Sequence, residues 1–150
     1  MRCESRNRDI SSLMNDVLNC IILLNKETES NFGMSFSRIL TLLAFTGKKR
    51  MYMNELSKIM SLNTSTSTRM IDGLVKDGFV ERGYDRSDRR VVTVRLTSKG
   101  KEMAKDIKAF KDRYFDSIKA KVKDNGKKEM VASLKTLLDA FEEFKSQLGG

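Results

Sequence analysis

Residues 63–96 read NTSTSTRMIDGLVKDGFVERGYDRSDRRVVTVRL, and the spacing of the apolar side chains changes part-way along. In the first half they recur at steps of three and four, which predicts a helix over Thr64–Asp77. In the second half they alternate with polar residues, which predicts paired strands over Phe79–Arg82 and Val91–Leu96. We therefore expect a helix followed by a β-hairpin, with the charged loop Gly83–Arg90 at the tip of the hairpin.

A shorter helix is predicted immediately before this one. Its apolar pattern covers Asn54–Met60, and residues 61–63 separate it from the next helix. A three-residue link is the length found in a helix-turn-helix. Asn63 suits the N-cap of the second helix, and Gly78 suits its C-terminal end. The pattern thus predicts a helix-turn-helix with a hairpin beside it.

Longer helices are predicted on both sides of this unit. They are Asp9–Glu29, a helix capped by Ser35 that ends near Gly47, Thr97–Lys123, and Lys127–Gln147 after a turn at Asp124–Gly126. The fold class is therefore mainly α with a small β-hairpin wing, a winged helix-turn-helix flanked by N- and C-terminal helices.

The outer helices carry more apolar surface than a small winged unit can cover. Burial of one leucine or phenylalanine side chain is worth roughly 1.5–3 kcal/mol, so these stripes need a partner. We expect residues 1–34 and 101–150 to form a dimerisation region and residues 35–100 to form a separate lobe. A larger core within one subunit is the alternative.

The net charge is concentrated in the centre of the chain. The whole sequence has 29 basic and 20 acidic residues, a net charge of +9. The segment Lys48–Lys105 alone has 14 basic and 7 acidic residues. Such an excess suggests a polyanionic partner, nucleic acid or an acidic membrane surface.

Several classes of protein are disfavoured. Histidine is absent, which removes histidine-based catalysis and histidine-ligated zinc, and no catalytic constellation, metal site or cofactor motif is recognisable. No apolar run approaches 18 residues, so no membrane span is expected. Cys3 and Cys20 form no CxxC pair, and no secretory signal is expected, so we predict a cytoplasmic protein with free thiols that is not an enzyme.

The helix Thr64–Asp77 and the hairpin loop both have features of a DNA reader. The helix opens with small hydroxyl residues, which approach phosphates and base edges closely, and Arg69 can pair with a guanine. In the loop, Asp85 and Asp88 alternate with arginines and can brace them, leaving at least one arginine to enter a minor groove. The alternatives are a capped, solvated helix start and a surface loop of mutually satisfied charges.

The segment Glu55–Gly100 resembles the winged-helix core of the MarR family of bacterial and archaeal transcriptional regulators. The resemblance rests on the wing motif at Asp85, Asp88 and Arg90, the preceding segment Gly78–Arg82, and the closing segment Leu96–Gly100. It covers nearly the whole chain, because the flanking helices match in number and order. It implies a homodimer, joined through its first and last two helices, that binds pseudo-palindromic operator DNA.

The resemblance assigns roles to particular positions. It implies that the major groove is faced by Ser65, Thr66, Thr68 and Arg69, that the wing tip near the minor groove holds Arg86 and Arg89, and that wing geometry is fixed by Asp88 and Arg90. The chain departs from the common pattern at Arg86, where proline is frequent, and at Tyr52, where a threonine or serine cap is frequent.

Regulation is also implied by the resemblance. Family members often respond to small anionic or phenolic effectors, and candidate pocket residues here are Met34, Phe36, Phe45, Phe110 and Tyr114, with ordinary core as the alternative. Some relatives sense oxidants through a cysteine of the first helix, where Cys20 lies; a small buried hydrophobic role is the alternative. The leading hypothesis is an effector-responsive repressor. A thiol-based sensor and a dimeric adaptor that binds proteins are the other two.

Overall fold

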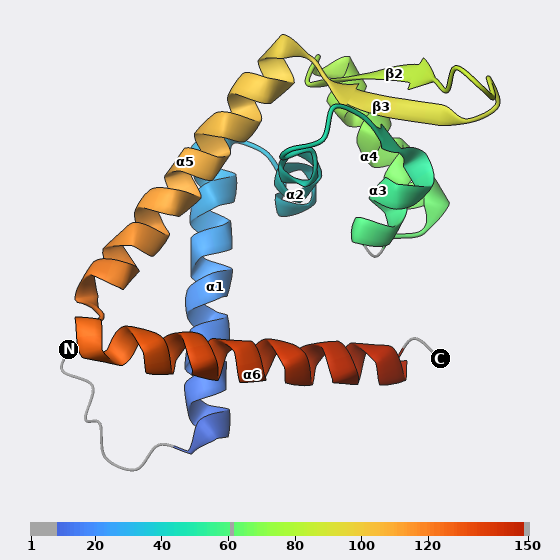
Figure 1. The fold of residues 1–150 in the computed structure, drawn as a ribbon. Coiled ribbons are helices and arrows are strands. Elements are labelled where there is room, and N and C mark those ends of the chain that lie inside the picture. The colour runs from blue at the N-terminus through green and yellow to red at the C-terminus, as the bar shows by residue number, and fades with distance from the viewer. Residues whose placement is uncertain (1–8, 61, 149–150) are drawn as a thin grey trace. The chain divides into compact units, whose positions relative to one another are not determined.

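The computed structural model describes residues 9–60 and 62–148 and is mainly helical (Figure 1). In chain order the elements are α1 (Ile10–Phe32), α2 (Phe36–Ala44), β1 (Met51–Tyr52), α3 (Met53–Ile59), α4 (Thr64–Lys76), β2 (Val80–Tyr84), β3 (Val92–Leu96), α5 (Ser98–Lys121) and α6 (Asp124–Leu148). The predicted fold class is confirmed. The chain forms two compact units whose boundary lies within α5, between Lys111 and Asp112.

The sheet has one strand more than the sequence predicted. It is antiparallel with the order β1-β3-β2. The predicted hairpin is present as β2 and β3, with Val80 opposite Leu96 and Tyr84 opposite Val92. The added strand β1 is only two residues long, and its Met51 lies opposite Val94. A two-residue strand is too short to show a periodic pattern, which is why the sequence gives no sign of it.

The core of the first unit lies where the three short helices meet the sheet. The side chains at its centre are 0–2% exposed: Ile39, Leu42, Met51, Leu56, Ile71, Leu74, Val80, Val94 and Ile107. They come from α2, α3, α4, α5 and all three strands. The hairpin of β2 and β3 projects beyond α3 and α4 as an arm (Figure 1). The core therefore fixes the base of the hairpin and leaves its tip in solvent.

Local hydrogen bonds explain most of the helix ends. Asn63 caps α4 as predicted, with Oδ1 accepting from the Thr66 backbone N–H at 2.8 Å. Gly78 follows α4 with a φ of +75°, the left-handed region that glycine adopts without strain. The prediction for Ser35 is wrong in one respect, because its side chain makes no capping hydrogen bond to α2. The start of α2 is held instead by Glu29 of α1, which accepts from a different amide, the Phe36 N–H, at 2.5 Å.

The second unit contains the end of α5 and all of α6. The predicted turn at Asp124–Gly126 is wrong as a separate turn, because these residues form the first turn of α6. Apolar side chains of α6 are 38–63% exposed at Met130, Val131, Leu134, Leu138, Phe141 and Phe144. Among the described residues, no helix is long and apolar enough to cross a membrane.

A second uncovered apolar surface lies on α1. Seven of its aliphatic side chains are 47–76% exposed: Ile10, Leu13, Val17, Leu18, Ile21, Ile22 and Leu23. Leu24 and Thr28, nearer the C-terminal end of the helix, are buried. Within the first unit, therefore, only the last part of α1 is covered.

Gly100 lies where the start of α5 meets the start of the hairpin. A Cβ atom at this position would lie 1.9 Å from the carbonyl oxygen of Phe79. Thr97 Oγ1 accepts from the Gly100 N–H at 3.0 Å, and the Thr97 N–H donates to the same Phe79 oxygen at 3.1 Å. The backbone around Gly100 therefore has no freedom to move away from an added side chain.

We predict that Gly100→Ala lowers the free energy of unfolding by about 3 kcal/mol or more, because the new methyl group meets a fixed backbone atom. Gly73→Ala is the matched control. A Cβ at Gly73, in the middle of α4, would meet nothing within 4 Å. That variant should gain up to about 1 kcal/mol from helix propensity. Denaturant unfolding of both variants tests the pair, and equal stability for Gly100→Ala and the parent contradicts the prediction.

Candidate nucleic-acid interface

The N-terminal half of α4 presents a polar face to solvent. Ser65, Thr66 and Arg69 are exposed and Thr68 is half-buried, whereas Ser67 is fully buried against the core. Ser65 Oγ donates to Asn63 Oδ1 at 2.8 Å, and Thr68 Oγ1 donates to the Thr64 carbonyl at 2.8 Å. Arg69 makes no ion pair with any other described residue. The helix therefore offers hydroxyls and one unpaired guanidinium on its outer face.

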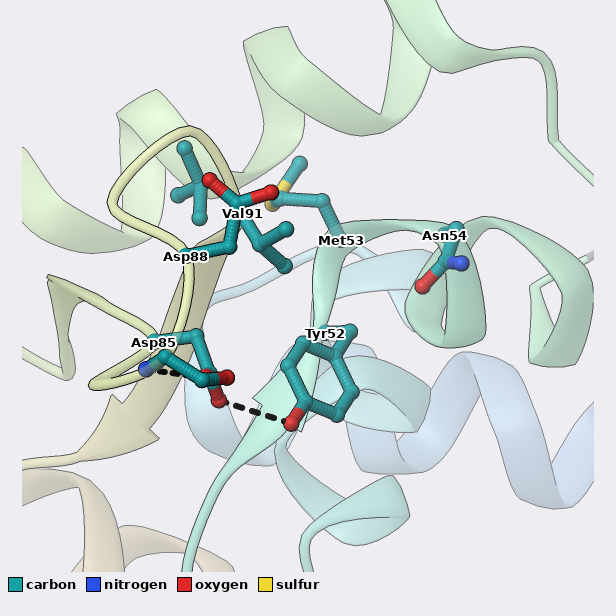
Figure 2. Close-up of a pocket in the computed structure, with 8 residues that line it drawn as sticks. Tyr52, Met53, Asn54, Asp85, Asp88 and Val91 are labelled. Atoms are coloured by element: carbon teal, nitrogen blue, oxygen red, sulfur yellow. Dashed lines mark hydrogen bonds between the residues drawn. The ribbon is translucent and has the colours of Figure 1, made fainter.

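Asp85 ties the wing loop to the edge strand of the sheet. Asp85 is 8% exposed. One oxygen of its carboxylate accepts from the Tyr52 hydroxyl at 2.9 Å and from Arg50 Nη2 at 3.1 Å. The other accepts from the Ser87 N–H at 2.9 Å and from the Ser87 hydroxyl at 2.5 Å. Figure 2 shows Tyr52 and Asp85 facing each other across this site. All the strong acceptor positions of the carboxylate are thus occupied.

The protonation equilibria of this pair follow from those contacts. Hydrogen bonds from Ser87 and Tyr52 hold the pKa of Asp85 well below its usual range. The same carboxylate raises the pKa of Tyr52, first through the hydrogen bond from the phenol and then through its negative charge. The phenol therefore stays a donor and the carboxylate stays an acceptor near neutral pH.

The sequence predicted only part of this hydrogen-bond network around Asp85. It identified Asp85 as a brace but expected arginines of the loop as partners, and the ion-pair partner is Arg50. Tyr52 precedes α3, where a threonine or serine was expected to cap the helix. Glu55 accepts from the Tyr52 N–H at 2.9 Å, so the helix start is still stabilised while the phenol points to the wing. In the sequence, the one sign of this contact was the large side chain of Tyr52 at a helix-capping position.

The arginines of the wing loop are exposed and unpaired. Arg86, Arg89 and Arg90 form no ion pair with another described residue. Asp88 does contact Arg90, but its Oδ1 accepts from the Arg90 backbone N–H at 2.9 Å, not from the guanidinium. The acidic side chains of the loop therefore bind the protein's own backbone and edge strand, and the cations point to solvent. The wing is not a loop of mutually satisfied charges.

Two hollows border the wing loop. One, of about 480 Å³, lies between the wing loop and the start of α3 and is lined by Tyr52, Met53, Asn54, Asp85, Ser87, Asp88, Val91 and Val92 (Figure 2). The other, of about 750 Å³, is lined by Tyr84, Asp85, Arg86 and Arg89. Tyr84, which the sequence analysis did not single out, is 67% exposed beside the two arginines. The second hollow suits an anion better, because Arg86 and Arg89 line it, whereas Asp88 lines the first.

An ion pair joins the wing to α4. Arg82 Nη1 of β2 lies 2.6 Å from Asp72 Oδ1 of α4. At the far end of α4, Arg38 of α2 pairs with Asp77, and Lys99 Nζ donates to the Asp77 carbonyl at 2.8 Å. The first contact ties α4 to the wing, and the other two tie the end of α4 to α2 and α5 within the first unit.

The five predicted effector-pocket residues are dispersed. Met34 and Phe45 belong to the buried core of the first unit. Phe110 packs edge-to-face on Phe32 at 5.7 Å between ring centroids, and Lys111 Nζ lies 5.7 Å from the Phe36 ring centroid. The fifth residue, Tyr114, belongs to the second unit. The structure therefore brings Met34 and Phe45 into one cluster, and a pocket made of all five stays a prediction.

Cys20 lies on α1 with an exposed thiol. It is therefore not a small hydrophobic residue buried by its own chain. The other cysteine, Cys3, lies outside the described residues.

Comparison with known proteins places this geometry in a family. The sequence pattern of the MarR family matches residues 37–92, which hold the helix-turn-helix and the wing as far as the first residue of β3. The chain is 31% identical to the HTH-type transcriptional repressor YetL of Bacillus subtilis over 134 residues, which cover 89% of this chain and 75% of YetL. The chain belongs to the MarR family. It is accordingly a winged-helix transcriptional regulator and not an enzyme.

Solved structures of the MarR fold agree with the chain over most of its length. FabT of Streptococcus pneumoniae, solved in complex with DNA, superposes with a TM-score of 0.79 at 23% identity, over 89% of this chain and 99% of FabT. Wild-type MarR from E. coli, solved in its apo form, superposes with a TM-score of 0.69 at 23% identity, over 91% of this chain and 98% of that one. At these identities the likeness concerns the fold alone.

We predict that Asp85→Asn destabilises this MarR protein near pH 7 and that the difference from the parent shrinks in acid. The folded pKa of Asp85 lies below the unfolded value of about 3.9, so its contribution is full above that pH and is lost as pH falls through the folded pKa. Denaturant unfolding between pH 7 and pH 2 measures the difference.

Asp88→Asn is the control for this measurement, because Asp88 is exposed and accepts one hydrogen bond where Asp85 accepts four. Tyr52→Phe, which removes one donor and keeps the ring, should have an intermediate effect. A stability difference for Asp85→Asn that does not change with pH would show that the charge of Asp85 is not what holds the loop.

Proposed function

We propose that this protein is a homodimeric repressor that binds a pseudo-palindromic operator and is released or modulated by a small effector. The observation that carries the proposal is a single lobe from which unpaired arginines project at two places, Arg69 on α4 and Arg86 and Arg89 on the wing. Unpaired, exposed cations held in a fixed relation are what phosphate and base-edge recognition needs.

In this proposal α4 lies in the major groove. Its N-terminal residues Ser65, Thr66, Thr68 and Arg69 meet the base edges and the flanking phosphates. The hydroxyls are short enough for close approach, and the guanidinium can bind the O6 and N7 atoms of a guanine with two hydrogen bonds. The buried Ser67 faces the core and takes no part.

The wing contacts the minor groove beside it. Arg86 and Arg89 supply the charge, which the enhanced negative potential of a narrow minor groove attracts. Asp88 and Arg90 shape the loop, and the hydrogen bond from the Tyr52 hydroxyl to Asp85 fixes the position of the loop on the sheet. The ion pair between Arg82 and Asp72 keeps the wing in register with α4, so both elements meet adjacent grooves.

Dimerisation explains the uncovered apolar surfaces. Apolar side chains of α1 and α6 are 38–76% exposed, and on each helix they recur at steps of three and four along the chain. Contiguous apolar surface of this kind marks a protein interface. We assign residues 1–34 and 101–150 to the dimer and residues 35–100 to the DNA-binding lobe. Two-fold symmetry then presents two copies of α4 to successive turns of one face of the duplex.

A small anionic or aromatic effector is the proposed signal. Phe110 packs on the Phe32 ring, and the ammonium of Lys111, which lies over the Phe36 ring, can pair with an anionic group. The proposed site would add Met34, Phe45 and Tyr114 as its remaining lining. Repression in particular is supported by the name of YetL, a transcriptional repressor.

The DNA-binding half of the proposal is tested with two arginine variants. We expect Arg69→Ala to cost about 1–3 kcal/mol of discrimination at one base position, because a base contact is lost. Arg86→Ala should weaken binding to all sequences and reduce the salt slope by about one unit, because a phosphate contact is lost. Selection of bound duplexes from a random pool, followed by salt titration of the selected duplex, measures both.

Arg95→Ala is the matched control, because Arg95 is exposed on the same hairpin but is paired with Glu81 at 2.8 Å. It should change affinity least of the three. An unchanged preference profile for Arg69→Ala would refute the assignment of α4 to the major groove. Absence of duplex binding by the parent protein at low salt would refute the whole proposal.

The dimer is tested on α6. We expect Leu134→Glu to convert the protein to a monomer in sedimentation analysis, because a charge would be buried in an apolar interface. Thr136→Glu adds the same charge to an exposed position two residues away, on the opposite face of the helix, and should stay dimeric. A dimeric Leu134→Glu variant would show that α6 is not part of the interface.

A further inference from the structure

One hydroxyl group links the three short helices of the DNA-binding lobe through two sulfur atoms. Thr41 Oγ1 of α2 lies 3.6 Å from Met60 Sδ, at the end of α3, and 3.3 Å from Met70 Sδ, in α4. Thr41 is fully buried, whereas Met60 and Met70 are half-buried. The two thioethers are therefore packed against a buried polar atom and are still within reach of small solutes.

The hydroxyl of Thr41 has only one hydrogen to donate. The carbonyl oxygen of Ser37 accepts it at 2.8 Å, the shortest of the three contacts. A thioether is a weak acceptor, so the two sulfur atoms lose little by packing against the oxygen without a hydrogen bond of their own. A stronger acceptor in their place would be left without a donor or would take the hydrogen from Ser37.

A second buried hydroxyl adjoins Met70. Ser67 Oγ is fully buried and has no hydrogen-bond partner among the described residues. Ser67 precedes Met70 by three positions in α4, so the two side chains are neighbours on the same helix face. A buried donor without an acceptor is unusual in a folded protein. An oxygen atom added to the sulfur of Met70 would supply an acceptor next to it.

We propose that Met60 and Met70 are an oxidation site of the DNA-binding lobe and that their conversion to sulfoxides by a two-electron oxidant weakens DNA binding. This inference rests on the proposed function, because its effect is expressed as release of DNA. The oxidant class is a peroxide or a hypohalous acid. Met70 is the principal residue, because its sulfur is closer to Thr41 and it adjoins both Ser67 and Arg69.

The chemistry is an oxygen transfer. A lone pair of the thioether sulfur attacks one oxygen of hydrogen peroxide, the O–O bond breaks, and the second oxygen leaves as water after a proton transfer. The sulfur loses two electrons to the peroxide and becomes a sulfoxide, which is polar where the thioether was apolar. No metal or thiol takes part.

The structural consequence follows from the hydrogen-bond inventory around Thr41. Two new sulfoxide oxygens need donors, and the buried hydroxyl hydrogens beside them are those of Thr41 and Ser67. Drawing the Thr41 hydrogen away removes the second hydrogen bond of the Ser37 carbonyl, which keeps only its bond within α2, and turning Met70 toward Ser67 shifts the side-chain packing of α4. Either change displaces α4 against α2 and α3, and Arg69 moves with it. The outer face of α4 then no longer matches the base edges that it reads.

The test compares methionine variants in a background that lacks both thiols, Cys3→Ser with Cys20→Ser. Three proteins in this background are treated with hydrogen peroxide or hypochlorous acid. They are the parent without further change, the double variant Met60→Leu/Met70→Leu, and the single variant Met103→Leu. Met103 is the matched control, a half-buried methionine that packs on the same core from α5. Affinity for the selected duplex is measured before and after treatment, and peptide mass mapping locates each added oxygen.

We expect oxidation to weaken duplex binding by the parent and by Met103→Leu about tenfold or more, the effect of leaving one buried polar group unpaired. Oxidation should change the duplex affinity of the double variant Met60→Leu/Met70→Leu by less than about twofold. Reduction of the oxidised parent by methionine sulfoxide reductases with dithiothreitol should restore binding. Equal release from the parent and the leucine variant, or retained binding by a parent whose Met60 and Met70 are both oxidised, overturns the inference.

Two further outcomes are assigned in advance. The protein with Cys20 restored is treated in parallel, and if oxidation releases DNA only from that protein, the thiol is the sensor and the inference about methionine is wrong. If the untreated parent binds no duplex, the proposed function fails, and hydrogen exchange of α3 and α4 then decides the inference. Faster exchange after oxidation in the parent but not in the leucine variant supports it, and equal exchange in both refutes it. If the leucine variant does not fold, hydrogen exchange of α3 and α4 is compared in the parent before and after oxidation. Faster exchange after oxidation supports the inference, and unchanged exchange refutes it.

Discussion

The carboxylate of Asp85 is the constraint on which the presentation of the wing depends. It accepts four hydrogen bonds, from Tyr52, Arg50 and the backbone and side chain of Ser87, and thereby anchors the loop to the edge strand. With Asp85 satisfied in this way, the nearby arginines have no acidic partner in the loop and face solvent. The same group that stabilises the wing therefore leaves its cations available, which connects a local hydrogen-bond arrangement to the basic surface of the lobe.

Much of the fold could be predicted from the sequence, because its determinants are local. Helical and alternating spacing gave α4 and the hairpin within a residue or two, and Asn63 and Gly78 marked the ends of α4 correctly. The resemblance to the MarR family was confirmed by comparison. What local spacing could not supply was any contact between distant segments. Tyr52 and Asp85 are 33 positions apart, and nothing in either neighbourhood names the other.

The same distinction explains the errors around the helices and the site. Ser35 is a good capping residue, but its side chain makes no capping hydrogen bond, and Glu29 of α1 accepts instead from the first amide of α2, that of Phe36. The outward direction of Ser65, Thr66 and Arg69 follows from helical geometry and was predictable. The contact of Thr41 with two methionines was not, because it requires three helices to be packed first. Sequence reasoning thus found the residues on the outer surface better than the contacts that hold them there.

The ion pair between Arg82 and Asp72 has a consequence for how binding measurements on this protein are read. Its side chains are 36% and 54% exposed, so dissolved ions screen it. Raising ionic strength therefore weakens two kinds of contact, those between protein and phosphate and the ion pair between the wing and α4. The number of ions that a titration reports as released would then exceed the number of phosphates touched, and the excess would measure how much the protein itself loosens.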